Sequence, residues 1–266
     1  MDKFENYLSI NRDSWNKKVD AHITSDFYNV EGFMKGTSSL NVIELEFLKD
    51  IKGKSVLHLQ CHFGQDTISL ERLGAIVTGI DLSDKAIEAA KEMAKELDSN
   101  AHFICCDIYD LPNHLDQEFD YVFTSYGTIG WLPDIDKWAA IVSRYLKPGG
   151  TFVFAEFHPV IWMYDDQFEG IIYSYFKEHA IVELETGSYA DRSSAVTTSS
   201  ITWNHGLGEV IQALIDSGLR IDVFKEYNYS PYNCFYRAVE MEPNKFGIEN
   251  IEGKLPMVYA LVAHKS

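Results

Sequence analysis

The sequence is poor in positive charge and has no long apolar run, and each shortage excludes a class of protein. It holds 23 lysines and arginines against 40 aspartates and glutamates, for a net charge of −17. Such a chain repels phosphate backbones, so we expect no nucleic-acid partner. No run approaches the roughly 18 apolar residues of a membrane-spanning helix. The first 15 residues lack the apolar stretch of a secretory signal. These features favour a cytoplasmic protein with no membrane partner.

Cysteine is also scarce, which bears on metal binding and disulfides. The four cysteines are Cys61, Cys105, Cys106 and Cys234, and their spacing fits neither a zinc site nor a disulfide framework. His58 and His62 are four residues apart, a spacing that pairs metal ligands on a helix. Because this segment is predicted to be a strand entering a loop, the two rings need not converge. We therefore predict reduced thiols and no metal site.

The segment from Ser55 to Asp84 organises the chain. Ser55–Leu59 is a short apolar run typical of a buried strand, and residues 60–65 interrupt it with small and polar side chains. Asp66–Leu73 has helical spacing before Gly74, and Ala75–Ile80 is a second apolar strand ending at Asp81. This order predicts the start of a doubly wound α/β sheet, in which ligands bind beyond the carboxyl ends of the strands.

The loop after the first strand lacks the glycines of a dinucleotide site. Gln60, His62 and Gln65 stand where the pattern G-x-G-x-x-G needs glycine, so a pyrophosphate would fit poorly. No Gly-Lys-Ser/Thr follows, which excludes a P-loop. S-adenosylmethionine (SAM) carries no phosphate, so it does not need a loop whose backbone can approach a pyrophosphate closely. Its ribose diol still needs a carboxylate at the end of the second strand, where Asp81 stands.

Several segments in order then resemble the motifs of one family. They are Val56–Gly64 (VLHLQCHFG, where the family usually has VLDLGCGxG), Gly79–Ser83, Cys106–Ile108, Phe119–Val122 and Leu146–Gly150. Together they resemble the class I SAM-dependent methyltransferases of small molecules, over roughly residues 40–160. The chain departs from the family pattern at three positions. His58 stands where the family usually has an acid, and Gln60 and His62 stand where it usually has glycines.

The resemblance implies a cofactor, SAM, with S-adenosylhomocysteine (SAH) as its product, and a set of residues that bind it. The implied cofactor-binding residues are Gln60, Cys61, His62, Phe63, Gly64, Asp81, Leu82, Asp107, Ile108 and Ser125. In this family the N-terminal segment often folds over the cofactor as a lid, which adds Trp15 and Tyr28. An alternative is that both aromatics are ordinary core residues.

We expect four consecutive parts within one fold. Residues 1–50 form a helical lid segment, with helices at 2–18 and 39–48; residues 51–158 form the SAM-binding core; residues 159–204 form an inserted antiparallel cap; and residues 205–266 complete the core. The family places the last strand, 256–264, antiparallel between strands 151–157 and 219–227. The fold class is thus a seven-stranded, mostly parallel, doubly wound sheet, with 228–255 as a long loop.

The acceptor side is predicted from residues at the strand ends and in the cap. Tyr126 and Trp131 follow the fourth strand, and His158 ends the fifth strand, where it is a candidate general base. The assigned catalytic residues are therefore His158 and Tyr126. The substrate-binding residues are Trp131, His158, Trp162, Tyr164 and His205. His158 could instead be held by a backbone bond in the turn set by Pro159, and His205 could simply cap the helix that follows it.

These observations predict an enzyme that transfers a methyl group from SAM to an oxygen, nitrogen or sulfur atom of a small molecule. Two alternatives remain open. One is a non-catalytic SAM-binding or interaction protein on the same fold, and the other is an NAD(P)-dependent enzyme, against which the missing glycines speak. The expected assembly is a monomer or a homodimer.

Overall fold

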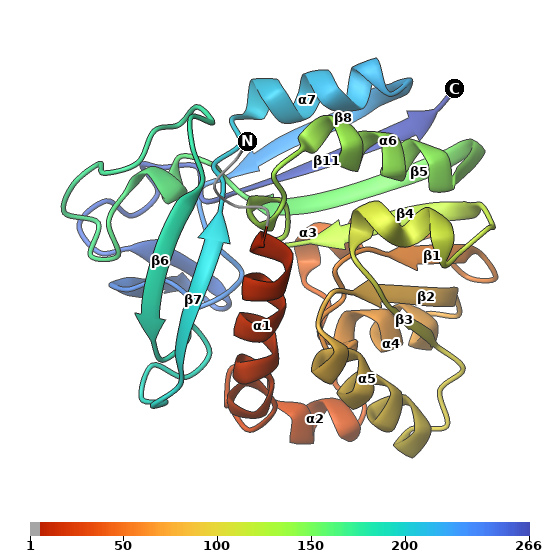
Figure 1. The fold of residues 1–266 in the computed structure, drawn as a ribbon, viewed down its shortest axis with the longest axis horizontal. Coiled ribbons are helices and arrows are strands. Elements are labelled where there is room, and N and C mark those ends of the chain that lie inside the picture. Colours follow the sequence, from red (N-terminus) through yellow and green to blue (C-terminus); the bar gives the residue numbers. More distant parts are fainter. Residues whose placement is uncertain (1–5) are drawn as a thin grey trace.

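A seven-stranded sheet forms the centre of the molecule (Figure 1). The computed structural model describes residues 6–266. The strand order is β3–β2–β1–β4–β5–β11–β8, and β11 runs antiparallel to both neighbours while the other adjacent pairs are parallel. The bounds are β1 Ser55–His58, β2 Ile76–Asp81, β3 His102–Cys105, β4 Phe119–Ser125, β5 Leu146–Phe157, β8 Leu219–Tyr227 and β11 Val258–Lys265. The predicted fold class is confirmed, including the antiparallel last strand.

Helices cover the two faces of this sheet (Figure 1). Their bounds are α4 Gln65–Arg72, α5 Asp84–Glu96, α6 Ile135–Tyr145 and α7 Leu207–Asp216. Ser83 and Asp134 begin α5 and α6, because their side chains accept the backbone N–H groups of Ala86 and Lys137. Three short 3₁₀ turns, η1 Ile108–Asn113, η2 Ile129–Trp131 and η3 Ile161–Met163, follow β3, β4 and β5.

The N-terminal segment is helical, with bounds that differ from the prediction. It forms α1 Tyr7–Ile23, α2 Val30–Met34 and α3 Val42–Leu45. Part of the predicted helix at 2–18, residues 2–5, lies outside the described residues, and the observed helix continues five residues past Lys18. The predicted helix at 39–48 is wrong in length. Asn41 caps α3 with Glu44 in a capping box, which fixes its start, and only one turn follows.

Residues 159–204 form an irregular stretch and one antiparallel hairpin, β6 Ile181–Thr186 with β7 Thr197–Thr202, which we call the cap hairpin. The first strand of this hairpin begins at Ile181, after the irregular stretch. The cap hairpin is joined to α1: the side chain of Asn11 accepts the N–H of Ile201 at 2.9 Å and donates to its carbonyl at 2.8 Å. Lys18 Nζ also lies 3.1 Å from Glu185 Oε2. Helix α1 therefore stands between the sheet and the cap hairpin (Figure 1).

The segment 228–255 is not the plain loop that we expected. It contains a second hairpin, β9 Ala238–Glu242 and β10 Lys245–Ile248. Asn244 in its turn has φ of 59°, a left-handed conformation that asparagine tolerates better than most residues. No helix among residues 6–266 is long and apolar enough to cross a membrane.

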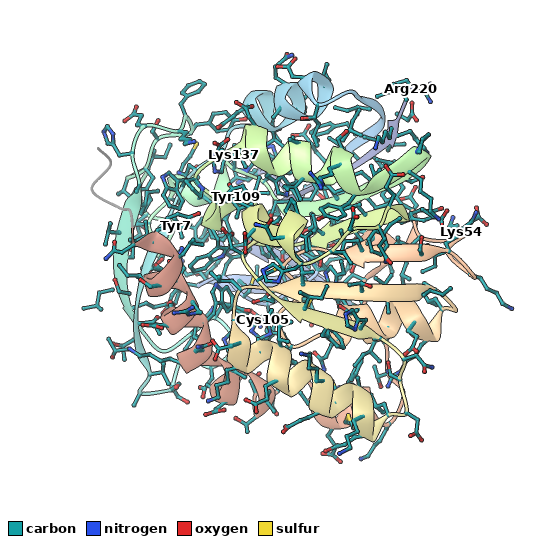
Figure 2. All side chains as sticks on the ribbon, turned by 45° about the vertical axis from the view of Figure 1, so that its right-hand side comes forward. Tyr7, Lys54, Cys105, Tyr109, Lys137 and Arg220 are labelled. Carbon is teal, nitrogen blue, oxygen red and sulfur yellow. The ribbon has the colours of Figure 1, made fainter. Side chains whose placement is uncertain are left out.

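The strands give the molecule two distinct ends. Figure 2 shows Lys54 and Arg220, beside the starts of β1 and β8, at the opposite side from Cys105, which ends β3. Tyr7 of α1 lies on the same side as Cys105 (Figure 2). The N-terminal segment therefore meets the carboxyl ends of the strands, where ligands bind in open α/β sheets.

Candidate functional site

A cavity of about 840 Å³ lies at the carboxyl ends of the strands. Its walls come from α1, the loops after β1, β2, β3, β4 and β5, the cap hairpin and residues 232–236. The predicted site residues that line it are Trp15, Tyr28, Gln60, Cys61, His62, Phe63, Gly64, Asp81, Leu82, Asp107, Ile108, Ser125, Tyr126, Trp131, Trp162, Tyr164 and His205. Its volume lies within the range of roughly 300–1,000 Å³ typical of small-molecule sites.

The loop after β1 keeps a glycine-like backbone without the glycines. Gln60, His62 and Gly64 have φ values of 54°, 51° and 83°, all in the left-handed region. A side chain in this region costs of order 1–2 kcal/mol per residue. Two such residues in one loop that lines the cavity therefore indicate a functional constraint on the backbone.

Asp81 ties this loop to the end of β2. Its Oδ2 accepts the His62 N–H at 2.8 Å, and its Oδ1 accepts the Ser83 N–H at 2.8 Å. Burial raises the pKa of Asp81 to about 6, against the opposing effect of these hydrogen bonds. Each carboxylate oxygen keeps a second lone pair, so the group can still accept the two hydroxyls of a diol.

Asp107 begins the turn η1, and its carboxylate accepts the N–H of Tyr109 at 3.3 Å. Ile108, the next residue, is buried against the core beneath the cavity. Asp107 and Ile108 together present a hydrogen-bond acceptor and an apolar edge, the pair of features that a flat heterocycle needs.

The His62 side chain packs against the N-terminal segment. Its ring stacks parallel to Tyr28, with ring centroids 5.4 Å apart, and meets the edge of Trp15 at 5.2 Å. His62 Nε2 lies 3.3 Å from Nδ1 of His22, a fully buried residue whose pKa burial lowers to about 3. Burial lowers the pKa of His62 as well, so both rings favour the neutral form, and one of them donates the shared hydrogen bond while the other accepts it.

Two polar atoms at this loop lack partners in the protein. Among residues 6–266, Gln60 Oε1 and His62 Nδ1 are buried and make no hydrogen bond. Gln60 Nε2 donates to the Thr128 carbonyl at 2.9 Å, which fixes the orientation of the amide. A bound molecule in the cavity would satisfy both orphan atoms, since unpaired buried polar groups are rare in native proteins.

The sequence reading missed Asp66, which lines the cavity at the start of α4. Its Oδ2 accepts the Ser125 hydroxyl at 3.2 Å, and burial raises its pKa. Glu44, fully buried nearby, accepts the Tyr126 hydroxyl at 2.7 Å, and its pKa rises to about 7 through burial and the charge of Asp66. In the described part of the chain neither carboxyl group is in a salt bridge, and of the two Asp66 lines the cavity.

Glu156 was also missed, although it interrupts the apolar strand TFVFAEF. Its carboxylate accepts the backbone N–H groups of Gly127, Thr128 and Ile129, together with the Thr128 hydroxyl and its neighbour's N–H. A side chain buried to this degree would be costly without so many donors. Glu156 therefore holds the loop after β4 in place against β5.

Tyr126, predicted to be catalytic, has φ of 36° and directs its hydroxyl to Glu44. Burial and the Glu44 charge raise its pKa well above 10. Its ring meets Tyr232 edge-on at 5.1 Å, and both rings line the cavity. Tyr126 therefore contributes its aromatic ring to the wall of the cavity, while its hydroxyl proton is donated to Glu44.

His158, the predicted base, lies outside the lining of the cavity. Its Nδ1 accepts the Val160 N–H at 3.2 Å, so Nε2 carries the proton and donates to Glu226 Oε1 on β8 at 3.0 Å. Only 3% of its surface is exposed. Both nitrogens are thus occupied within the protein. The geometry supports the alternative role, a histidine held in the turn before η3.

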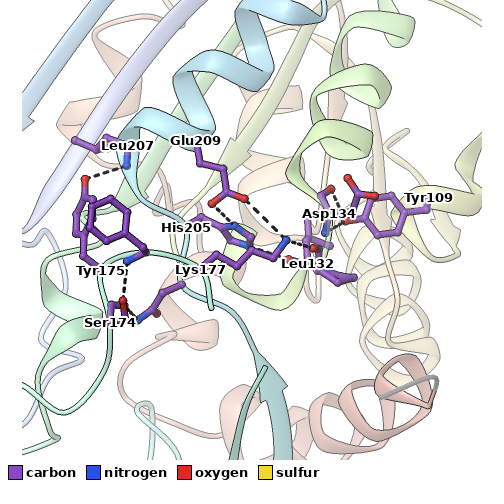
Figure 3. A network of polar contacts seen from close by, with 12 residues as sticks. Tyr109, Leu132, Asp134, Ser174, Tyr175, Lys177, His205, Leu207 and Glu209 are labelled. Carbon is purple, nitrogen blue, oxygen red and sulfur yellow. Dashed lines mark hydrogen bonds and ion pairs between the residues drawn. The ribbon is translucent and has the colours of Figure 1, made fainter. Parts of the chain in front are cut away.

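His205 lies at the start of α7 and has partners on both sides (Figure 3). Its Nε2 lies 2.8 Å from the Leu132 carbonyl and its Nδ1 lies 3.1 Å from Glu209 Oε2. Figure 3 also shows Lys177 beside Glu209, with 3.9 Å between their charged groups. His205 therefore joins the loop after η2 to α7 while one face of it borders the cavity.

Trp131, Trp162 and Tyr164 supply further aromatic surface. Trp131 meets Trp15 of α1 at 5.1 Å, and Tyr164 stacks on Phe168 at 5.5 Å. Within residues 6–266 no group of three or more histidine, cysteine, aspartate or glutamate side chains is arranged to hold a metal ion. The arrangement is that of an aromatic chamber beside a polar loop.

Comparison with known proteins places this site in context. A family model described as a methyltransferase domain matches residues 56–150. An uncharacterized methyltransferase of Synechocystis sp. is 30% identical over 182 residues, covering 67% of this chain and 84% of that protein. A protein named ubiquinone biosynthesis O-methyltransferase of Coxiella burnetii is 32% identical over 138 residues, covering 51% of this chain. The chain spans 58% of the length of that relative.

Solved structures with the same fold are more distant in sequence. A SAM-dependent methyltransferase of Mesorhizobium loti superimposes with a TM-score of 0.56 at 22% identity, covering 87% of this chain and all of that one. A protein titled as the DhpI–SAH complex gives a TM-score of 0.58 at 17% identity over 98% of this chain and 97% of that one. At such identities the likeness concerns the fold.

Proposed function

Because the chain belongs to the class I SAM-dependent methyltransferases, we propose that it transfers a methyl group from SAM to an oxygen, nitrogen or sulfur atom of a small molecule. The observation that carries the proposal is the cavity. It brings Asp81, Asp107 and the strained loop 60–64 together beside an aromatic chamber. Family membership gives SAM, and not NAD(P), as the cofactor.

The cofactor-binding residues divide along the cavity. We assign the ribose hydroxyls to Asp81, whose two oxygens each keep a free lone pair, and the adenine to Asp107 and Ile108. Leu82 and Phe63 add apolar surface on either side. These roles are supported by the position of each residue at the end of its strand, as the doubly wound fold requires.

The methionine end is assigned to the other half of the loop. Asp66 has a buried carboxyl group that is in no salt bridge in the described chain, and an α-ammonium group beside it would favour its ionised form. Gln60 and His62, each with one buried polar atom that has no partner in residues 6–266, line the same cavity. Trp15 and Tyr28 hold the His62 ring from the lid side, so the N-terminal segment contributes to the cofactor site.

Bound SAM supplies a methyl group that is already activated by the sulfonium. The protein therefore has to bind, orient and exclude water, and orientation alone can supply a large share of the rate. Glu156 fixes the loop 127–129, and Tyr126 and Trp131 form the walls next to it. We assign no general base, because both ring nitrogens of His158 are occupied within the protein.

The proposal is tested by calorimetric titration of the purified protein with SAM and with SAH. We expect micromolar binding of both, followed by SAH formation from SAM when a suitable acceptor is present. Absence of binding to both would overturn the assignment of the site. Tight SAH binding without SAH formation across phenols, thiols and amines would favour a non-catalytic SAM-binding protein.

A further inference from the structure

The charge of the cavity is strongly one-sided. The aspartates and glutamates that line it outnumber its lysines and arginines by eight to two. Both cations are already engaged: Lys18 pairs with Glu185 at 3.1 Å, and Arg192 donates to the Phe235 carbonyl and lies 4.3 Å from the ring of Tyr236. An anionic acceptor would therefore meet no free positive charge in the described walls.

The carboxylates of the cavity differ in how far their oxygens are still free to bind a ligand. The proposed function assigns three of them, Asp81, Asp107 and Asp66, to the cofactor. The carboxylate of Glu156 already accepts hydrogen bonds from the 127–129 loop. The others lie at the cap. Asp165 accepts two backbone N–H groups of its own turn, and Glu183 accepts one hydroxyl, that of Tyr173, at 2.8 Å.

Asp166 has the fewest partners. In the described chain no donor reaches its carboxylate, while burial and the charges of Glu185 and Asp165 raise its pKa. Asp166 and Glu183 are both exposed at the solvent end of the cavity, so this end forms a negatively charged mouth. Burial and the charges of both carboxylates raise the pKa of Tyr173, so both lie near that side chain, which also lines the cavity.

The surfaces behind this mouth are aromatic and apolar. Trp162 and Leu184 line the cavity although 40% and 77% of their surfaces are exposed, and Tyr164, Phe168 and Phe235 continue the wall inward. Aromatic faces attract cations as well as apolar groups. The combination fits a ligand with an apolar body and a positive charge.

Tyr259 gives an independent sign of a polar ligand. It lies on β11 beside Glu156, lines the cavity and is only 1% exposed, yet its hydroxyl makes no hydrogen bond within residues 6–266. A buried hydroxyl without a partner is destabilising, and a hydrogen-bonding group of the ligand would satisfy it.

We propose that the methyl acceptor is an amine on an apolar, aromatic-sized body, which the carboxylates of Asp166 and Glu183 recruit as its ammonium ion. This inference rests on the proposed function and names the class of its substrate. It differs from the oxygen acceptor in the name of the Coxiella burnetii relative, whose match covers 51% of this chain.

The chemistry balances without a further reactant. The ammonium group first releases one proton to solvent through the mouth, which leaves a nitrogen lone pair. That lone pair forms the new N–C bond to the methyl group while the C–S bond breaks and its electron pair returns to sulfur. The products are SAH and an N-methylated ammonium ion, so the positive charge moves from sulfur to nitrogen.

The test uses three probes of one size that differ in charge: phenethylamine, 2-phenylethanol and 3-phenylpropanoate. Each is titrated calorimetrically into the SAH-loaded protein, and each is incubated with SAM. We expect the amine to bind at least about tenfold more tightly than the anion and to be the probe that yields a methylated product with equal SAH. Equal or tighter binding of the alcohol or the anion, or no binding of the amine, would overturn the inference.

Matched variants test whether the carboxylates of the mouth cause the preference for the amine. Glu183→Gln and Asp166→Asn should each weaken phenethylamine binding about threefold to tenfold and leave SAH binding unchanged. The control is Glu178→Gln, which removes the same charge from an exposed residue of the cap segment outside the cavity lining. Equal effects of Glu183→Gln and Glu178→Gln would mean that only the overall charge of the protein matters. They would contradict the proposal that the carboxylates of the mouth recruit the amine.

A second pair of variants tests whether the Tyr259 hydroxyl contacts the ligand. Tyr259→Phe and Tyr227→Phe each remove a buried hydroxyl without a protein partner, but only Tyr259 lines the cavity. Weaker phenethylamine binding in the first variant alone supports a ligand contact, and equal binding in both contradicts it. Amine preference is measurable with or without SAH, so a failure of cofactor binding, which concerns the proposed function, is recognised separately.

Discussion

Asp81 has two tasks at once, because it holds the loop beside it and offers lone pairs to the cavity. Replacement by asparagine removes the charge and one acceptor oxygen while it keeps the size of the side chain. Hydrogen bonds to charged groups contribute about 1.5–3 kcal/mol, so Asp81→Asn should weaken SAM binding about 10- to 100-fold. Calorimetry measures this, with Asp222→Asn on exposed β8 as the control. Unchanged affinity would contradict the ribose assignment.

The same carboxylate makes cofactor binding depend on pH. Its pKa of about 6 lies above the ordinary 3.8 because the folded protein buries it. Protonation therefore stabilises the fold at low pH, and that contribution is lost as pH rises through about 6. The ribose hydroxyls need the ionised form, so SAM affinity should be constant above pH 7 and fall as pH drops below about 6. Titrations from pH 7.5 to 5 test this, and Asp81→Asn should flatten the profile.

Glu156 acts through the loop that it holds. In Glu156→Gln an amide NH₂ group would replace one of the two carboxylate oxygens and would face the N–H group of either Gly127 or Thr128, and the charge that attracts both would be gone. Breaking such a buried network costs about 2–4 kcal/mol of the free energy of unfolding. Denaturant unfolding measures the loss. Glu178→Gln, at an exposed position, should change stability by less than about 0.5 kcal/mol.

Some residues of the site follow from the sequence and others do not. Asp81 and Asp107 end recognisable strands, so their place at the cavity could be predicted from strand order. Asp66 and Glu156 matter because of loops that fold back on them, and no local pattern shows those contacts. His158 was misread because a residue at a strand end can face either side. Its partner, Glu226, lies 68 residues further along the chain.

At the scale of elements, α1 and the cap hairpin form one unit. The side chain of Asn11 satisfies both backbone groups of Ile201, so it replaces a strand neighbour. Asn11→Ala would leave these buried groups unpaired, at about 1–3 kcal/mol each. We expect faster hydrogen–deuterium exchange in residues 197–202 with little change in the central sheet. Lys17→Ala, exposed on the same helix, is the control, and identical exchange in both variants would refute the coupling.

Elements were predictable where the chain repeats a period and has a capping residue. Helix α5 shows this, because Ser83 caps it and its buried residues share one face, and strand β8 has the predicted bounds 219–227. The hairpin of β9 and β10 was missed because its strands are only five and four residues long and show little apolar alternation. The end of α3 depends on tertiary packing, since Glu44 is used both in its cap and in the bond to Tyr126.

At the scale of the whole molecule, the net charge of −17 and the acidic mouth act together on a cationic acceptor. Screening lengths shorten from about 10 Å at 0.1 M salt to about 3 Å at 1 M. The dissociation constant of phenethylamine should therefore rise with added potassium chloride. That of neutral 2-phenylethanol should stay nearly constant. Calorimetry at several salt concentrations compares the two, and parallel behaviour would show that charge does not guide the amine.

The two-sided construction of the cavity has an evolutionary consequence. The segment matched by the methyltransferase model, 56–150, supplies the wall with Asp81 and Asp107, while α1, the cap hairpin and residues 232–236 supply the facing wall. Mutations in the cap hairpin and in residues 232–236 can therefore change which molecule fits the cavity while the strands that end at Asp81 and Asp107 stay as they are.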